Sequence, residues 1–345
     1  MKKTSLIIGI FLFSLSLMGQ TVVTLNHQGN TTLYRGANAV VEANAAAVNG
    51  DTINIPGGFF TSITISKKLV IFGTGHFPDS LNATGRSYLT SGLTLNDGSD
   101  SSHIEGLYIN GDINFASNAD IDDVIIKRCN FSALNFSGTT KNNNRALINQ
   151  NVIRGSADFN NASYLTFSNN ILVGRIYNAT ENIMFDHNNL LTCIGYNNGN
   201  CFTTVSNVIF SNNILQNTWS SYSGFLAGEN NVFQNNLFNF DPTGSWSNNV
   251  YTSNIISVNS DSIFVNHALN TGFEYTHDFN LKSTSSGKNA ATDGTDIGIY
   301  GGLPEYTYKT SWMPANPHIS TKTIAPTTDS NGKLGVNIKV NAQDK

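Results

Sequence analysis

One eight-residue pattern recurs eight times between Ser102 and Ile256, and it restricts the possible folds more than any other feature of the chain. The pattern reads apolar, any, apolar, any, any, Asn, any, apolar. Its clearest copies are residues 165–172, 183–190 and 208–215. Apolar residues recur at every second position and Ile, Val and Phe predominate, which is typical of β-strands and not of helices. The repeat therefore predicts a stack of similar strands.

We call the sixth position of the pattern the slot. Its occupants in chain order are Leu107, Cys129, Asn151, Asn170, Asn188, Asn213, Asn236 and Asn254. They are 18 to 25 residues apart, which indicates outward loops of variable length between regular strands. An unpaired buried amide costs about 1–3 kcal/mol, whereas amides stacked at a shared inward corner can bond to one another. We therefore expect a structural ladder, with Cys129 and Leu107 as apolar fillers.

A second short strand follows most copies of the pattern. These strands are expected at residues 112–115, 133–136, 157–159, 175–177 and 193–196. Together they predict an all-β fold, a single-stranded right-handed parallel β-helix of about twelve coils. The leucine-rich repeat is the main alternative, because its signature contains a similar core. The variable repeat length, and a second strand where that fold has a helix, favour the β-helix.

The N-terminal part resembles a known family. The Ala-rich segment 36–48 predicts a short capping helix, which would cover the open first coil. Residues 50–60 (GDTINIPGGFF) and 62–75 (SITISKKLVIFGTG) then supply a turn and alternating strands. This opening resembles that of secreted bacterial right-handed parallel β-helix proteins of the pectin-lyase-like superfamily. Residues 291–302 (ATDGTDIGIYGG) are similar to the closing motif of such proteins in the Bacteroidetes.

The first residues indicate export. Residues 1–19 contain two lysines, an apolar run and a final Gly19, the order of a secretory signal peptide. We expect cleavage after Gly19 and a secreted or cell-surface protein. No later apolar stretch approaches the roughly 20 residues that a membrane span requires.

The rest of the chain divides into two parts. Residues 20–302 form the predicted β-helix, and residues 303–345 form an extended C-terminal tail with a terminal strand. In that strand Leu334, Val336, Ile338 and Val340 alternate with polar residues. The tail either covers the C-terminal edge of the solenoid or serves as a docking or secretion element.

Composition narrows the partners. Only 12% of residues are charged and the net charge is −4, so no basic stripe is available to bind nucleic acid. A neutral surface rich in Asn, Ser and Thr suits a polysaccharide or a cell-surface glycan. Because the capping helix would prevent end-to-end association, we expect a monomer. Cys193 and Cys201 are close enough in sequence to bridge one loop, although spacing alone leaves that bridge open.

The resemblance implies polysaccharide lyases and hydrolases as the related enzymes. A lyase needs a basic residue and often Ca²⁺, whereas a hydrolase needs paired carboxylates. The nearest approach to a calcium-plus-base group is an acidic cluster followed by two basic residues: Asp120, Asp122, Asp123, Lys127 and Arg128. Acidic residues in a turn also commonly cap it or face solvent. Glu105, one coil earlier, suggests a weak surface ion pair with these basic residues.

Three further groups of residues are considered as sites. Asp293 and Asp296 could hold Ca²⁺, although Asp-Gly is also an ordinary turn; no other cofactor is expected. Asp186 and His187 are predicted to point to opposite faces of a strand, which argues against an acid–base pair. The aromatic residues Trp219, Tyr222, Trp246 and Trp312 lie outside the alternating core positions and could stack on sugar rings or pack over their own loops.

Three hypotheses follow. The leading one is a secreted, non-catalytic β-helix that binds glycans or a cell surface along its stacked strands. The alternative is a carbohydrate-active enzyme, in particular a calcium-dependent polysaccharide lyase of the pectate-lyase-like kind. A purely structural adhesin is a third.

Overall fold

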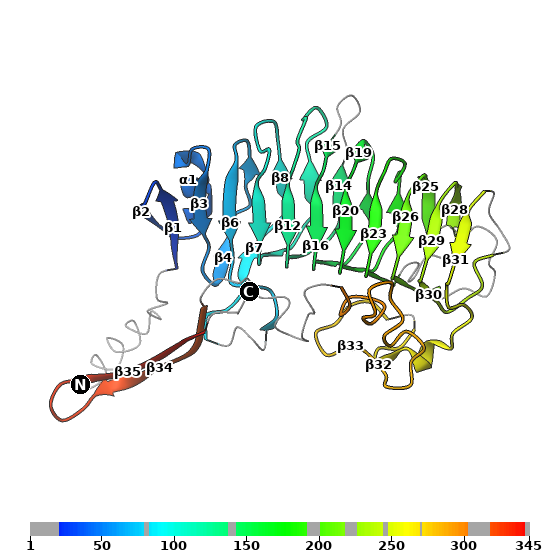
Figure 1. Cartoon of the computed structure of the whole chain (residues 1–345). Helices are drawn as coiled ribbons and strands as arrows, with labels where there is room; N and C mark the ends of the chain where they lie inside the picture. Colours follow the sequence, from blue (N-terminus) through cyan, green and yellow to red (C-terminus); the bar gives the residue numbers. More distant parts are fainter. Residues whose placement is uncertain are drawn as a thin grey trace, which may run out of the picture.

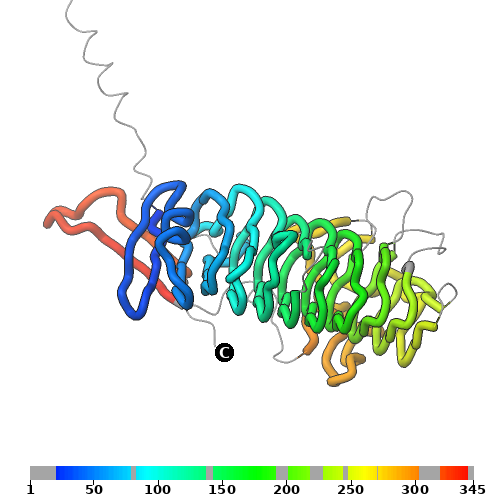
Figure 2. The backbone as a smooth tube through the Cα atoms, turned by 90° about the horizontal axis from the view of Figure 1, so that it is seen from above, coloured from blue at the N-terminus to red at the C-terminus, as the bar shows by residue number. Residues whose placement is uncertain are grey.

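The structure, a computed structural model, describes residues 21–78, 83–136, 143–191, 201–217, 226–243, 248–269, 271–302 and 318–341. They form an elongated stack of parallel strands with one short α-helix at the N-terminal end (Figures 1 and 2). The predicted all-β parallel β-helix with a short capping helix is confirmed. The expected signal peptide, residues 1–19, lies outside the described residues.

Three long sheets run along the stack, and we call them sheets A, B and C. Sheet A contains, in spatial order, β2 (Asn30–Arg35), β1 (Val22–His27), β3 (Asp51–Asn54), β6 (Leu69–Phe72), β9 (His103–Glu105), β12 (Ile125–Lys127), β16 (Leu147–Asn149), β20 (Thr166–Ser168), β23 (Met184–Asp186), β26 (Ile209–Ser211), β29 (Val232–Gln234) and β31 (Val250–Thr252).

Sheets B and C receive the later strands of each coil. Sheet B contains β4 (Gly58–Phe60), β7 (Ser87–Leu89), β10 (Tyr108–Ile109), β13 (Asn130–Phe131), β17 (Val152–Ile153), β21 (Ile171–Leu172), β24 (Asn189–Leu190), β27 (Ile214–Leu215) and β30 (Leu237–Phe238). Sheet C contains β5 (Thr64–Ile65), β8 (Leu93–Leu95), β11 (Ile113–Phe115), β14 (Leu134–Phe136), β18 (Ala157–Asp158), β22 (Ile176–Tyr177), β25 (Phe202–Ser206) and β28 (Leu226–Glu229). A small additional sheet pairs β15 (Asn143–Asn144) with β19 (Ala162–Ser163).

The core is a column of stacked apolar side chains. Parallel pairing places Phe167 opposite Phe185 in the next coil, and Phe185 opposite Phe210. The rings of Phe185 and Phe210 stack with centroids 4.6 Å apart, and those of Phe210 and Phe233 with centroids 4.9 Å apart. These distances match the spacing of neighbouring strands, about 4.8 Å. Regular pairing of the backbone therefore also packs the core.

The slot residues lie over one another at the corner between sheets A and B. Asn188 Oδ1 accepts hydrogen bonds from the backbone amide of Asn170 at 2.8 Å and from its side-chain amide at 3.2 Å. Asn188 Nδ2 donates to the carbonyl of Phe167 at 2.8 Å. The same bonds link Asn151, Asn170, Asn188, Asn213, Asn236 and Asn254. The backbone amide of Cys129 continues the column by donating to Asn151, and Leu107 and Cys129 are fully buried.

Starting with the slot residue Cys129, each slot residue is preceded by a residue with a positive φ. These φ angles lie between 52° and 60°. These left-handed residues are Arg128, Gln150, Asn169, His187, Asn212, Asn235 and Ser253. Asn tolerates this conformation better than most residues, and the tight corner it creates turns the chain from sheet A into sheet B. Side chains at these corners point away from the core.

The N-terminal end is capped by two elements. The helix α1 (Ala39–Ala46) buries Ala39, Val40 and Ala43. The strands β1 and β2 form an antiparallel hairpin, and β1 pairs antiparallel with β3. Both elements cover the first coil, whose backbone and apolar core would otherwise be open.

The prediction of about twelve coils is too high. Among the described residues, sheet C has eight strands and sheet B nine. After β31 the chain turns back along the outside of sheet B, and we call residues 257–302 the return segment (Figure 1). It contains the 3₁₀ turn η2 (Ser260–Ser262) and the antiparallel pair β32 (Phe264–Asn266) and β33 (Asp278–Leu281).

The return segment covers an apolar stripe. Val152, Ile171, Ile214 and Leu237, one from each of four coils, point outward from sheet B and are buried against Phe264, Phe279, Leu281, Ile297 and Ile299. These four outward positions of sheet B are thus apolar because the return segment covers them.

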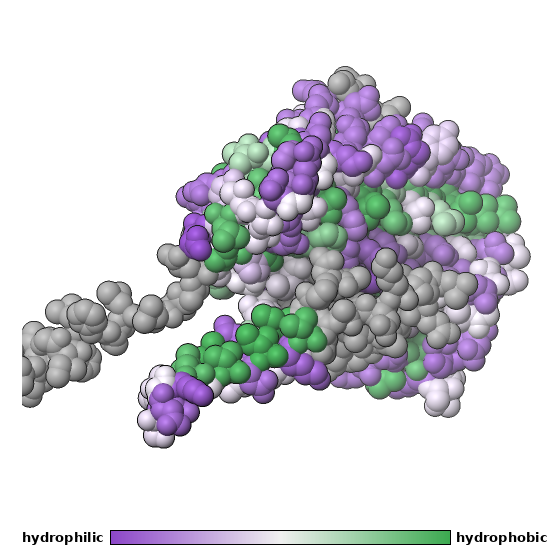
Figure 3. All heavy atoms as spheres, turned by 60° about the vertical axis from the view of Figure 1, so that its left-hand side comes forward, coloured by the Kyte–Doolittle hydropathy of each residue, from purple (hydrophilic) through white to green (hydrophobic). Residues whose placement is uncertain are grey.

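The C-terminal tail forms a separate hairpin. β34 (His318–Thr328) pairs antiparallel with β35 (Leu334–Asn341), and the hairpin extends from beside the N-terminal coils instead of covering the C-terminal edge (Figures 1 and 2). Its apolar side chains line one face (Figure 3) and are about half exposed: Ile324, Leu334, Val336, Ile338 and Val340.

The predictions for the three cysteines, and for the strand expected at residues 193–196, have different outcomes. Cys129 is buried with a free thiol, and burial raises its pKa to about 12. Cys201 is disulfide-bonded, while Cys193 lies outside the described residues. The strand expected at 193–196 also lies outside them, and β25 instead pairs with β22, with Ile176 opposite Phe202.

Candidate functional site

The outer face of sheet C presents one side chain from each coil. The inward neighbours are buried in the strands from β8 to β25, so the outward position can be identified in each of these six strands. In chain order the outward residues are Thr94, Asn114, Asn135, Asp158, Tyr177 and Thr203, and each is directly opposite the next. All six are half-buried. We call this row the sheet C column. Its polar side chains repeat with the spacing of the strands, about 4.8 Å.

The amides in this column keep part of their bonding capacity. Asn135 Nδ2 donates to Asn114 Oδ1 at 2.9 Å, which orients both groups along the stack. Asn178, next to Tyr177, donates to Asp158 Oδ1 at 2.9 Å. The Asn135 oxygen and the Asn114 nitrogen have no protein partner among the described residues, so an acceptor and a donor remain for a ligand or water.

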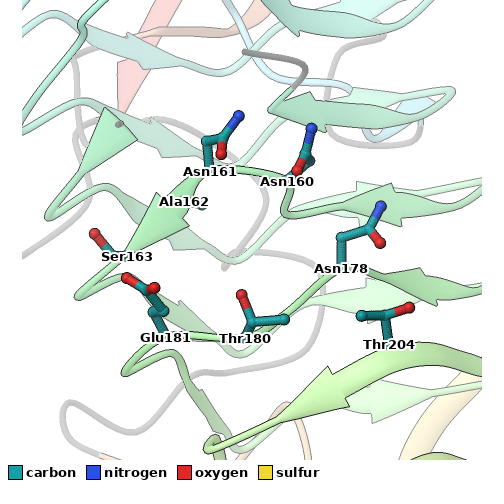
Figure 4. A pocket seen from close by; sticks show the side chains of 8 residues that line it. All are labelled: Asn160, Asn161, Ala162, Ser163, Asn178, Thr180, Glu181 and Thr204. Carbon is teal, nitrogen blue, oxygen red and sulfur yellow. The ribbon is translucent and has the colours of Figure 1, made fainter. Parts of the chain in front are cut away.

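A small pocket opens beside the column, where the chain leaves sheet C for sheet A (Figure 4). Its volume is about 160 Å³. Three successive coils line it with Asn160, Asn161, Ala162, Ser163, Asn178, Thr180, Glu181 and Thr204. Three of these, Asn161, Asn178 and Thr204, have φ between 54° and 60°. Left-handed corners in consecutive coils therefore form the pocket.

The lining can bond to hydroxyl groups. Amides and hydroxyls both donate and accept, and Glu181 is the one charged residue that lines the pocket. The carboxylates of Glu181 and Asp158 accept hydrogen bonds and disfavour a polyanion. Tyr177 adds an aromatic ring to the adjoining column. A volume of this size suits one sugar unit, with neighbouring units lying along the column.

The acidic cluster and the basic residues named in the sequence do not converge. Arg145 binds Asp122 at 3.0 Å and Asp123 at 2.7 Å. Asp123 and Arg128 lie at opposite ends of β12, and five residues of extended chain span about 16 Å. The backbone amide of Asp120 donates to Asp97. The carboxylates of Asp97, Asp122 and Asp123 therefore hold turns of neighbouring coils together.

Lys127 and Arg128 instead lie near Glu105. Arg128 Nη1 is 3.0 Å from Glu105 Oε1, and His103 Nε2 is 2.9 Å from Glu105 Oε2. Glu105 and Arg128 are buried, so the expectation of a weak surface pair is wrong. Burial alone would raise the pKa of Glu105, but the hydrogen bond from His103 and the charge of Arg128 lower it overall. Burial lowers the pKa of Lys127.

The prediction that Asp186 and His187 face apart is also wrong. His187 Nδ1 is 3.0 Å from Asp186 Oδ2, because the left-handed His187 is a corner and not a strand residue. His187 Nε2 lies 3.4 Å from Thr295 Oγ1, which suggests an Asp–His–Thr arrangement. However, His187 is 3% exposed, and Thr295 Oγ1 donates to Asp293 at 2.6 Å. The group fastens the return segment to the solenoid.

Asp293 and Asp296 do not share a ligand position. Asp293 bonds to Thr295, whereas Asp296 Oδ2 lies 2.6 Å from Lys288 Nζ and Asp296 Oδ1 accepts from the backbone of Asn289. The described residues contain no cluster of three or more His, Cys, Asp or Glu side chains that could hold a metal ion. Calcium binding therefore remains a prediction that rests on sequence.

The remaining candidates fall outside the described residues. These are the aromatic residues Trp219, Tyr222, Trp246 and Trp312. Within the described residues, no helix has the length and apolar character needed to cross a membrane.

Sequence reasoning missed the sheet C column. The signal was present in the second strands, where Asn114, Asn135 and Asp158 each stand between two apolar residues. When those strands are aligned in sequence, these three side chains fall on one row.

Comparisons with known proteins give little about activity. No family model matches the chain, and no curated protein does. Among solved structures, the chain is similar to one titled "Crystal structure of pectate lyase Pel9A", at 16% identity and a TM-score of 0.35. The likeness covers 77% of this chain and 94% of that chain. At this identity and score, it carries no information on activity.

Proposed function

We propose that this protein is a secreted, non-catalytic glycan-binding solenoid, and that it holds a neutral polysaccharide along the sheet C column. The observation that carries the proposal is the row of outward side chains from Thr94 to Thr203, in register over six coils and adjoining a hydroxyl-bonding pocket. An extended polymer can contact several coils at once, and weak contacts along one chain add to a useful affinity.

The charges favour a neutral ligand. Asp158 lies within the column and Glu181 within the pocket, so a uronate chain would place its carboxylates beside them. Neutral sugars can donate hydroxyl hydrogens to both groups and stack a ring face on Tyr177.

Secretion is part of the same proposal and rests on the sequence of residues 1–19. Export would bring the column into contact with polysaccharides of the surroundings or of a cell surface. A purely structural adhesin would be retained on cells without binding soluble glycans.

The test is binding and cleavage measured on the same polysaccharides. Purified protein is passed over immobilised β-glucan, mannan, xylan and polygalacturonate, and the size of each polymer is followed after long incubation with Ca²⁺. We expect retention on at least one neutral polymer with no change in its size. Shortening of polygalacturonate with unsaturated products, abolished by a chelator, would support the lyase alternative instead. Binding of none would overturn the proposal.

A further inference from the structure

A second cluster with different chemistry lies on the outer face of sheet B, near its N-terminal end. Phe59, Tyr88 and Tyr108 are the outward residues of three successive coils and are in register. The Phe59 and Tyr88 rings have centroids 4.8 Å apart, and the Tyr88 and Tyr108 rings stack at 4.9 Å. Phe59 is 71% exposed. The solenoid thus presents a short aromatic strip along its axis.

Two arginines flank this strip. The Arg86 guanidinium lies 4.7 Å from the centre of the Tyr108 ring, and that of Arg154 lies 4.9 Å from the same centre. Arg154 also donates to the Tyr108 hydroxyl at 2.5 Å and to the carbonyl of Ile109 at 2.9 Å. These contacts fix both guanidiniums against one aromatic ring.

Neither arginine has an acidic partner among the described residues. The ion pairs found there involve other cations, and Arg154 Nε is buried without a hydrogen bond. By contrast, Arg128 and Arg145 each lie against a carboxylate. Two half-buried cations without a counter-charge favour an external anion, which the planar guanidinium can bind through two parallel hydrogen bonds.

On the side of the return segment, the described side chain that approaches Arg86 is a phenol. There Tyr275 bonds to Asn130 at 2.9 Å and to His76 at 3.1 Å, and its ring lies 5.9 Å from Arg86. His76 is neutral: burial, and then the charges of Arg86 and Arg154, lower its pKa to about 3. Among the described residues, the groups in contact with or charge-coupled to the two arginines thus include the phenols of Tyr108 and Tyr275 and the neutral imidazole of His76.

We propose that this cluster is a second saccharide site, which takes a sugar bearing a negatively charged substituent, a carboxylate or a sulfate. The substituent lies between Arg86 and Arg154, and the sugar ring lies on the strip of Tyr88 and Phe59. The site is independent of the sheet C column, since it is on another sheet and has the opposite charge. The overall charge of −4 disfavours non-specific binding of polyanions.

The test uses three polymers with one backbone: dextran, carboxymethyl dextran and dextran sulfate. We expect either or both anionic forms to bind in a salt-dependent way, and the stronger of the two identifies the substituent. Arg86→Gln should lower that affinity at least tenfold, and Phe59→Ala, at an exposed position, several-fold. Arg145→Gln, which removes an arginine already paired with carboxylates, is the matched control and should bind like the wild type.

Thermal unfolding of each variant separates loss of binding from loss of fold. The proposal is overturned if neither anionic dextran binds, or if Arg86→Gln and Phe59→Ala fold normally and bind as tightly as Arg145→Gln. Tyr177→Ala should leave this binding unchanged, so failure of the sheet C column and failure of this site give different results.

Discussion

Asn188 accepts two hydrogen bonds from Asn170 through a single oxygen, one from the backbone amide at 2.8 Å and one from the side chain at 3.2 Å. Asn188 in turn donates to Asn213 at 2.9 Å and to the carbonyl of Phe167 at 2.8 Å. Each slot amide therefore joins its own coil to both neighbours. The ladder of slot amides lets a polar residue occupy a fully buried corner in five consecutive coils, from Asn151 to Asn236.

Removing one of the slot asparagines should destabilise the solenoid strongly. Asn188→Ala would leave two donors of Asn170 and the Phe167 carbonyl unpaired, each at a cost of about 1–3 kcal/mol. We expect a loss of at least about 2 kcal/mol in the free energy of unfolding, measured by denaturant titration. Asn118→Ala, at an exposed turn, is the control and should unfold like the wild type. Equal denaturant midpoints of unfolding for the two variants would contradict a structural role for the slot asparagines.

The buried pair of Glu105 and Arg128 should make stability depend on pH. Because the pKa of Glu105 is lowered in the folded protein, its contribution is present above its ordinary value of 4.5 and is lost as the pH falls through the folded value. We expect Glu105→Gln to reduce stability at neutral pH, and this deficit to shrink below about pH 4.5. Asp123→Asn, in an exposed pair, should change the midpoint little at either pH. A deficit for Glu105→Gln that is the same at pH 7 and pH 3 would contradict this account.

The return segment depends on close contact at Gly298. A methyl group there would lie 2.5 Å from Asn189 Oδ1 and 2.7 Å from Ile214 Cδ1, whereas nothing lies within 4 Å of one at Gly294. Both glycines have positive φ, 93° and 81°, so the backbone cost of alanine is similar. Gly298→Ala should expose residues 271–302 to limited proteolysis much faster than Gly294→Ala. Indistinguishable cleavage of the two variants would show that the segment is held by other contacts.

The sequence predicted the strands because their signal is local. Alternation and the repeated Asn specify both the strand and its corner, and the same pattern in successive copies fixes the register. The backbone conformation at the corner was not predicted. His187 follows Asp186 in sequence, but its left-handed φ of 53° keeps both side chains on the same, outer side of the coil. The rule that successive side chains of a strand point to opposite faces does not hold at such a left-handed residue.

The return segment could not be read from local patterns. The pattern leaves the position after each slot open, although Val152, Ile171, Ile214 and Leu237 are all apolar there. That signal shows that something covers sheet B, but not what covers it. Contacts between Asn169 and Gly301, which are 132 residues apart, appear only in three dimensions.

Affinity for the best neutral polysaccharide, measured by titration calorimetry for Tyr177→Ala and Tyr88→Ala, tests the proposed function most directly. Both tyrosines are half-buried outward strand residues, one in the sheet C column and one on sheet B. We expect Tyr177→Ala to weaken binding by about tenfold, a typical effect of removing one stacked ring, and Tyr88→Ala to bind like the wild type. Unchanged affinity in a folded Tyr177→Ala variant would contradict the account.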